Sequence, residues 1–245
     1  GFTVVVHFIA PQTSSLPLQT RIQPGEVIFL LAYLIFVAWM LSLGIWKYLP
    51  ASWKENFTKN KLGILLYKLG LFVIIPALSL SLLWKVEWSA LGFSIVELPR
   101  QLLIVFLLIL LLGGFNLVAG KAAAPLRSRE FTALQIGLGL LVTFVWNIFE
   151  VGLVEEFFFR AFLQGRLTNF LASPLSGICA ASLLFGLAHA PGIYLRGAGK
   201  DDPLGSKPAL IDAILYSILV LSATGWFIGL LYWRTQSLLA PVMVH

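Results

Sequence analysis

The chain alternates between long apolar runs and short polar connections. Most of the runs reach the roughly 20 residues that a helix needs to cross a bilayer. The runs are 27–46, 62–84, 101–120, 131–170, 175–190, 209–233 and 238–245. This pattern predicts an all-α, polytopic transmembrane bundle of about seven or eight helices.

The connections between the runs differ in charge. Basic residues gather in 47–61 and 121–130, whereas 85–100 is balanced. Counting spans in turn places both basic connections on one side, which the positive-inside rule makes cytoplasmic. Residues 1–25 contain three prolines and are expected to form an extended, non-spanning lead-in on the other side.

Two runs carry residues that are unusual in a membrane span. Lys68 lies near the start of 62–84, where it can extend to the headgroups, and Pro76 is expected to kink that span. The run 131–170 is twice as long as one crossing needs and contains five charged residues. We expect a continuous or slightly broken helix there.

Near the C-terminal end, glycines and prolines mark the predicted breaks. Pro191 is expected to end the helix at 175–190, and 191–208 to form a loop. Residues 234–237 are expected to form a tight polar turn before the last apolar run.

The composition agrees with a membrane protein. The 245 residues are 59% hydrophobic and 11% charged, where soluble domains carry about a quarter charged residues. Mean hydropathy is +0.91. The net charge of +6 is spread over connections rather than gathered in a basic arm, which indicates contact with anionic lipid and not with nucleic acid. We expect a single multi-pass protein of the plasma or inner membrane.

The single cysteine and the two ends add further constraints. Cys179 is alone, which excludes an intrachain disulfide and a cysteine metal cluster. Gly1 at the start, and His245 inside an apolar run, lead us to expect a piece of a longer chain. Nothing at the N-terminus resembles a cleavable signal peptide.

The first candidate for chemistry is a group of three charges in the longest run. Glu156 and Arg160 are four residues apart, so on a helix they share a face and can pair. Glu155 is rotated by about 100° and points elsewhere. Charges inside a membrane are costly and are functional candidates by default. On these residues alone, a structural ion-pair cluster and a proton-exchanging site are equally good interpretations.

Two histidines are the other candidates. His189 closes the segment Phe185-Gly-Leu-Ala-His189 and by itself is most simply a helix-capping residue before Pro191. His245 lies eight residues into the last apolar run, where lipid contact does not explain it, so we expect it to face inward. Taken together, glutamates and histidines on three helices can activate water for hydrolysis, either directly or by holding a divalent metal.

At this point the sequence resembles a known family. Glu155-Glu156-Phe-Phe-Phe-Arg160 matches an EExxxR motif, Phe185 to His189 matches FxxxH, and His245 follows the run that begins Gly229-Leu-Leu-Tyr-Trp-Arg. The chain is similar to the CAAX protease and bacteriocin-processing (CPBP, or Abi) family of intramembrane endopeptidases. The family includes the type II prenyl-protein endopeptidase that removes the last three residues of CAAX proteins. The resemblance covers 131–245, preceded by generic transmembrane helices over 26–130.

The resemblance implies a role for each matching residue. Glu155 would activate water together with His189, and Glu156 and Arg160 would orient and tune it. His245 would polarise the scissile carbonyl and stabilise the oxyanion, and Phe185 is expected to contact the substrate. The family's third motif continues HxxxN, which would place its asparagine beyond residue 245.

The resemblance leaves the cofactor open. Family members have been described both as glutamate-dependent and as metalloproteases. No cofactor is certain; Glu155, His189 and His245 would be the ligands if a metal such as zinc were present, and we lean against a permanently bound one. The expected substrate is a hydrophobic or lipid-anchored peptide or protein in the membrane.

One geometric condition decides between these interpretations. Counted from the start of their runs, Glu155 and His189 fall at opposite faces of the membrane. Catalysis therefore needs a broken or tilted helix over 131–170, or a helix that enters a water-filled cavity.

Two other classes of function remain. A non-catalytic scaffold or a bacteriocin-immunity-type protein could keep the fold and bind a partner. A small transporter could use the charges as a proton relay, but the internal repeat that such proteins carry is not visible here.

Overall fold

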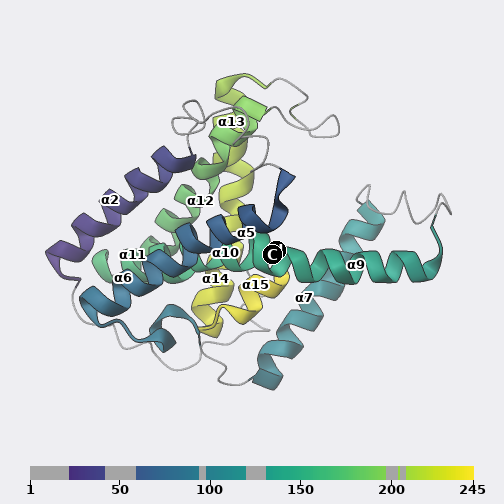
Figure 1. Ribbon diagram of the computed structural model, residues 1–245, viewed down its shortest axis with the longest axis horizontal. Helices are drawn as coiled ribbons and strands as arrows, with labels where there is room; N and C mark the ends of the chain where they lie inside the picture. Colours follow the sequence, from purple (N-terminus) through teal and green to yellow (C-terminus); the bar gives the residue numbers. More distant parts are fainter. Residues whose placement is uncertain (1–21, 42–58, 94–97, 120–130, 197–203, 205–207) are drawn as a thin grey trace.

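The computed structural model describes residues 22–41, 59–93, 98–119, 131–196, 204 and 208–245. Every regular element in these ranges is a helix (Figure 1). Five helices among them are long and apolar enough to cross a membrane. The prediction of an all-α polytopic bundle is therefore confirmed. Residues 1–21, 42–58 and 120–130, which include most of the lead-in and nearly all of both basic connections, lie outside the described residues.

The N-terminal part of the bundle contains two apolar helices. Helix α2 spans Pro24–Leu41. The predicted span at 62–84 is one helix, Lys61–Trp84, made of α5 (Lys61–Leu69), the π-helical η1 (Gly70–Ile74) and α6 (Ile75–Trp84). Pro76 lies in the first turn of α6, which follows η1 directly. The change from π-helical to α-helical hydrogen bonding therefore occurs beside a residue that has no backbone N–H to donate.

A short connection and a third span follow. The 3-10 helix η2 (Trp88–Leu91) ends at Gly92, which has a left-handed backbone with φ of 79°. Helix α7 covers Leu98–Ala119, close to the predicted 101–120.

The long run forms one continuous helix over Ala133–Phe170. It consists of α9 (Ala133–Asn147), η4 (Ile148–Leu153), α10 (Val154–Glu156), η5 (Phe157–Gln164) and α11 (Gly165–Phe170). Thr132 and Gln135 form a capping box that starts α9. Figure 1 shows α9 reaching out from the bundle, and none of its residues is buried. The expectation of a continuous helix is met, but only its second half packs in the core.

Helix α12 spans Pro174–Arg196 and contains Pro191 in its interior. The prediction that Pro191 ends this helix, and that the loop begins there, is therefore wrong. A proline removes one backbone hydrogen bond, which is a local cost, and apolar residues continue the helix beyond it.

The C-terminal part turns back along the bundle. Its helices are α13 (Leu210–Tyr216), η6 (Ser217–Leu221), α14 (Ser222–Thr235) and α15 (Leu239–Val244). Gln236 has a left-handed backbone with φ of 54° and caps α14, and the Leu238 amide donates to the Gly92 carbonyl at 3.0 Å. The predicted turn at 234–237 thus begins two residues later, after Thr235.

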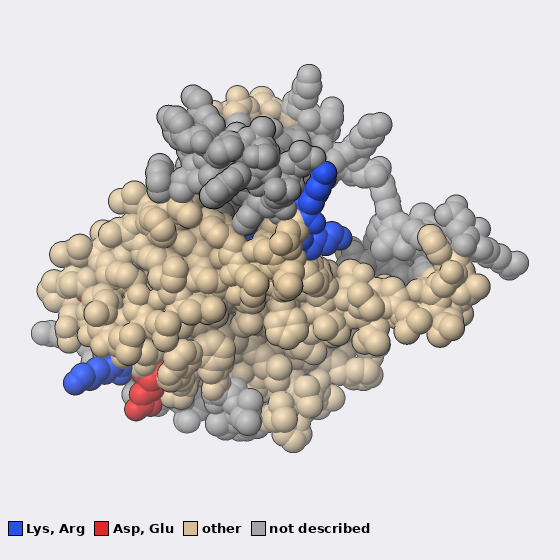
Figure 2. All heavy atoms as spheres, viewed as in Figure 1, with Lys and Arg blue, Asp and Glu red and all other residues tan. Residues whose placement is uncertain are grey.

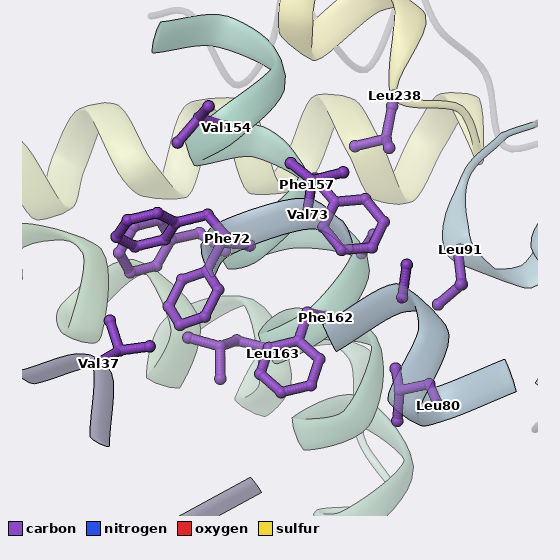
Figure 3. Close-up of a cluster of buried hydrophobic side chains, with 14 of the residues drawn as sticks. Val37, Phe72, Val73, Leu80, Leu91, Val154, Phe157, Phe162, Leu163 and Leu238 are labelled. Carbon is purple, nitrogen blue, oxygen red and sulfur yellow. The ribbon is translucent and has the colours of Figure 1, made fainter. Parts of the chain in front are cut away.

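Aromatic side chains from η5 fill the centre of the bundle. Phe157 and Phe162 are fully buried and lie among side chains of α2, η1 and α6 (Figure 3). The outer surface is apolar as well, and on the face shown in Figure 2 charged side chains appear only in isolated places. The packed core therefore holds the middle of the long helix, while apolar faces point outward as a membrane requires.

Candidate active site

The two adjacent glutamates lie on α10, a three-residue α-helical segment between the π-helical segments η4 and η5. π-helical turns are rare in proteins, and those that occur are often found at functional sites. The Glu156 side chain is fully buried, whereas that of Glu155 is 27% exposed. The predicted divergence of the two side chains is therefore present, with one carboxylate inside the bundle and the other at an accessible surface.

Glu156 connects two parts of the site. Its Oε2 accepts a hydrogen bond from Arg160 Nε at 2.9 Å, and both side chains are fully buried. Its Oε1 accepts from His245 Nδ1 at 2.5 Å, across 89 residues of sequence. Since a buried charge is stable only when it is paired and hydrogen-bonded, Glu156 is held ionised and joins α10 to the end of α15.

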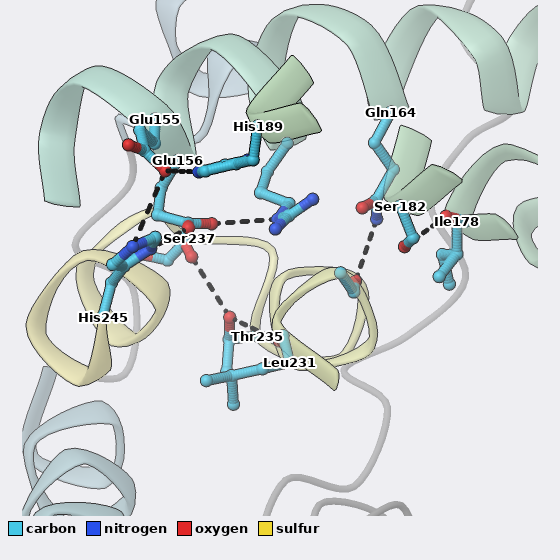
Figure 4. A network of polar contacts seen from close by, with 12 residues as sticks. Glu155, Glu156, Gln164, Ile178, Ser182, His189, Leu231, Thr235, Ser237 and His245 are labelled. Carbon is cyan, nitrogen blue, oxygen red and sulfur yellow. Dashed lines mark hydrogen bonds and ion pairs between the residues drawn. The ribbon is translucent and has the colours of Figure 1, made fainter. Parts of the chain in front are cut away.

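Glu155 faces both histidines. Its Oε2 lies 3.7 Å from His189 Nε2 and 3.7 Å from His245 Nε2 (Figure 4). Both distances exceed a direct hydrogen bond, and within the described residues this oxygen has no hydrogen-bond partner although it is buried. Two imidazole nitrogens and one unpartnered carboxylate oxygen therefore converge on one place.

The bonds on the far side of each imidazole determine which nitrogen carries a proton. His189 Nδ1 lies 2.7 Å from the Phe185 carbonyl oxygen, which can only accept, so Nδ1 carries the hydrogen. In neutral His189 the Nε2 lone pair then points at the site. His245 Nδ1 likewise donates to the Glu156 carboxylate, which turns its Nε2 toward Glu155.

The Phe185 ring packs against the cluster. It is 3% exposed, and its ring centroid is 4.7 Å from that of His189 and 6.2 Å from that of His245. The Arg160 guanidinium carbon lies 5.0 Å from the same ring centroid. The Phe185 ring thus contacts both imidazoles and the arginine and helps to hold them in place.

Glu155 and His189 lie at the same depth in the bundle because they are equally far from the turn that joins their two helices. The long helix ends at Phe170 and α12 begins at Pro174, and the two pack as antiparallel neighbours. Glu155 is fifteen residues before Phe170 and His189 is fifteen residues after Pro174, which puts both roughly 20 Å from the turn. The expected separation to opposite faces is therefore wrong, because it was counted from the start of α9, which extends beyond the bundle.

Two ion pairs between the long helix and N-terminal helices were not expected from the sequence. Lys68 Nζ lies 3.2 Å from Glu150 Oε1, so Lys68 is directed to a neighbouring helix rather than only to the headgroups. Arg166 Nη1 lies 3.0 Å from Glu26 Oε1, and both side chains are nearly buried. The signal available was the excess of charges in 131–170, but the partners lie 82 and 140 residues away. Asp212, which had no assigned role, is exposed in the first turn of α13.

The donor types of the cluster match those that zinc takes. Their arrangement does not form a ready metal site: in the described part of the chain no three His, Cys, Asp or Glu side chains are placed to hold a metal ion. The cluster can, without such an ion, hold a water between a carboxylate and an imidazole and present a second imidazole beside it.

One comparison with known proteins gave a match. Residues 137–245 match the family model described as type II CAAX prenyl endopeptidase Rce1-like. The matched segment includes Glu155, Glu156, Arg160, His189 and His245. Neither the curated proteins nor the solved structures gave a match.

Proposed function

We propose that this chain, whose residues 137–245 belong to the type II CAAX prenyl endopeptidase family, is an intramembrane endopeptidase that uses water activated by glutamate and histidine. Membership of that family implies CAAX-type protease activity in general. The finer proposal is a membrane-associated, lipid-anchored peptide or protein as substrate, with prenylated CAAX sequences as the first class to test.

One observation carries the proposal. The Glu155 Oε2 atom is buried, has no hydrogen-bond partner in the described structure, and faces two Nε2 atoms at 3.7 Å each. A buried polar atom without a partner costs about 1–3 kcal/mol, so such an atom at a helix junction needs a reason. A water molecule, or the polar backbone of a substrate, would supply the missing donor.

The proposed first step is proton transfer from water. The Glu155 carboxylate and the Nε2 lone pair of His189 both accept, so one water can donate to both and present its oxygen to a peptide carbonyl. Glu155 takes the proton as the oxygen attacks the carbonyl carbon, and a tetrahedral intermediate forms. The same proton then passes to the leaving amine, which breaks the peptide bond.

His245 is placed to act on the carbonyl oxygen. When protonated, it donates through Nδ1 to Glu156 and through Nε2 toward the site, where negative charge develops on the oxygen. Glu156 fixes the ring, and Arg160 balances the charge of Glu156. Glu156 and Arg160 are therefore proposed as positioning residues.

Glu155→Gln tests the proposal with the least change in shape. The purified variant should lose at least about 10²-fold in the rate of cleaving a farnesylated peptide that ends in a CAAX sequence, because general-base catalysis contributes about 10²–10⁴-fold. Asp212→Asn, on the exposed face of α13, is the control and should cleave at the wild-type rate.

Full activity of the purified Glu155→Gln protein would overturn this mechanism. Wild-type protein that binds such peptides without cleaving them would favour the scaffold or immunity-type alternative.

A second test concerns the metal. We propose that no resident metal is required, because Glu156 is committed to Arg160 and a water between Glu155 and His189 accounts for the proposed chemistry. Prolonged treatment with a zinc chelator should leave the cleavage rate unchanged. Loss of cleavage that added zinc restores would contradict this.

A further inference from the structure

Helix α15, which His245 follows directly, touches the long helix at a position without a side chain. Gly152 in η4 is buried, and a Cβ atom built on it would lie 2.6 Å from the Val242 carbonyl oxygen. Carbon and oxygen atoms in weak contact are usually about 3.3 Å apart or more. The two backbones are therefore closer here than any other residue would allow.

This contact lies one turn before the reacting groups on both helices. Glu155 follows Gly152 by three residues, and His245 follows Val242 by three residues. Helical hydrogen bonds run from the Val242 amide to the Leu238 carbonyl, at 2.9 Å, and from the His245 amide to the Pro241 carbonyl, at 3.0 Å, so Val242 and His245 belong to one hydrogen-bonded segment. A displacement at Gly152 is consequently transmitted to His245.

We propose that Gly152 is a positioning residue, which sets the distance between Glu155 and His245 by admitting the Val242 carbonyl. The contact is with a backbone oxygen, so no side-chain rotation relieves a clash there. A methyl group at Gly152 must push α15 away by roughly 0.7 Å, if the contact is to reach an ordinary length. The kinetic part of this inference rests on the proposed peptidase function, whereas its structural part does not.

Gly152→Ala tests the inference in the full chain. Misplacement of catalytic groups by about 1 Å can cost on the order of 10²-fold in rate, so we expect kcat to fall by 10- to 100-fold with KM nearly unchanged. Gly137→Ala and Gly139→Ala are matched controls on the same continuous helix, because a Cβ at either position meets nothing within 4 Å. Both should cleave at the wild-type rate.

A spectroscopic readout decides the structural part without any activity. The chain has three histidines, so ¹⁵N-histidine labelling gives a simple NMR spectrum. The resonance of the His245 Nδ1 proton, which is bonded to Glu156, is assigned as the one that disappears in His245→Gln. In Gly152→Ala this resonance should shift or vanish while the melting temperature stays close to wild type. An unchanged His245 resonance in the folded variant overturns the proposal, whatever the activity.

A double variant distinguishes backbone from side-chain contact. Val242→Ala removes Cγ1, which lies 3.3 Å from the Cβ position, but leaves the carbonyl oxygen at 2.6 Å. Gly152→Ala combined with Val242→Ala should therefore keep the altered His245 resonance. Restoration of the wild-type resonance in the double variant would show that the carbonyl does not set the distance.

Discussion

At the scale of single residues, Glu155 and Glu156 differ in surroundings more than in chemistry. Glu156 is fully buried and bonded to Arg160 and His245. Glu155, its neighbour, retains an accessible side chain and an oxygen that accepts nothing from the described residues. One carboxylate is therefore held in position by two side chains, and the other keeps one oxygen without a donor among the described residues.

The buried pair gives a prediction that separates folding from catalysis. Glu156→Gln should destabilise the protein by about 3–5 kcal/mol, because Arg160 is left as an uncompensated buried charge. Adding Arg160→Met should recover most of that stability, since replacing both partners by uncharged groups is often neutral, while cleavage stays low because His245 has lost its carboxylate partner. Reversible unfolding in detergent measures the first effect and peptide cleavage the second. Equal stability of the single and double variants would contradict the pairing argument.

Single residues also show which contacts of the site can be predicted from the sequence. The spacing of Glu156 and Arg160 predicts their pairing, and the structure contains it at 2.9 Å, because one turn of one helix determines it. The bond between Glu156 and His245 is invisible in the sequence. It depends on how α14, Gln236 and α15 turn the chain back, which no local pattern encodes.

At the scale of elements, two ion pairs hold N-terminal helices against the long helix. Glu26 of α2 and Arg166 of α11 are 7% and 6% exposed, whereas Lys68 of α5 and Glu150 of η4 are 34% and 28% exposed. The distances are similar, at 3.0 and 3.2 Å. Burial is therefore the main difference between the two pairs.

This difference predicts unequal costs. Glu26→Gln should destabilise the fold by more than about 1 kcal/mol, because the buried Arg166 guanidinium loses its carboxylate partner. Glu150→Gln should cost at most about 1 kcal/mol, because Lys68 is about a third exposed and can extend to the headgroups when it loses its partner. Unfolding free energies of the two variants under one condition check the contrast. A larger loss in Glu150→Gln would show that burial does not govern these pairs.

The sequence locates most helices and fails on two of their properties. Runs of about 20 apolar residues predict the spans within a few residues, because bilayer thickness imposes that length. Pro191 was expected to end α12, but one lost hydrogen bond does not outweigh continued packing of the helix. The depth of Glu155 does not follow from the sequence, because α9 and η5 form one helix and no local pattern shows which half lies inside the bundle.

At the scale of the whole molecule, orientation in the membrane stays a prediction. The basic connections at 47–61 and 121–130 should face the cytoplasm together. In a Cys179→Ser background, Lys54→Cys and Arg127→Cys should be protected from an impermeant maleimide added outside intact cells. Glu87→Cys, in the balanced connection between them, should be labelled. Labelling of Lys54→Cys but not Arg127→Cys would contradict this arrangement.

The pairing of Glu156 with Arg160 inside one helix has a consequence for biosynthesis. Both residues leave the ribosome within a single turn, so each is neutralised before α12 and α15 have been made. His189 and then His245 arrive later, and His245 completes the cluster only after the whole matched segment has been translated. The chain thus enters the membrane with its most costly charges already matched, and the cluster of Glu155, His189 and His245 forms only once α15 has been made.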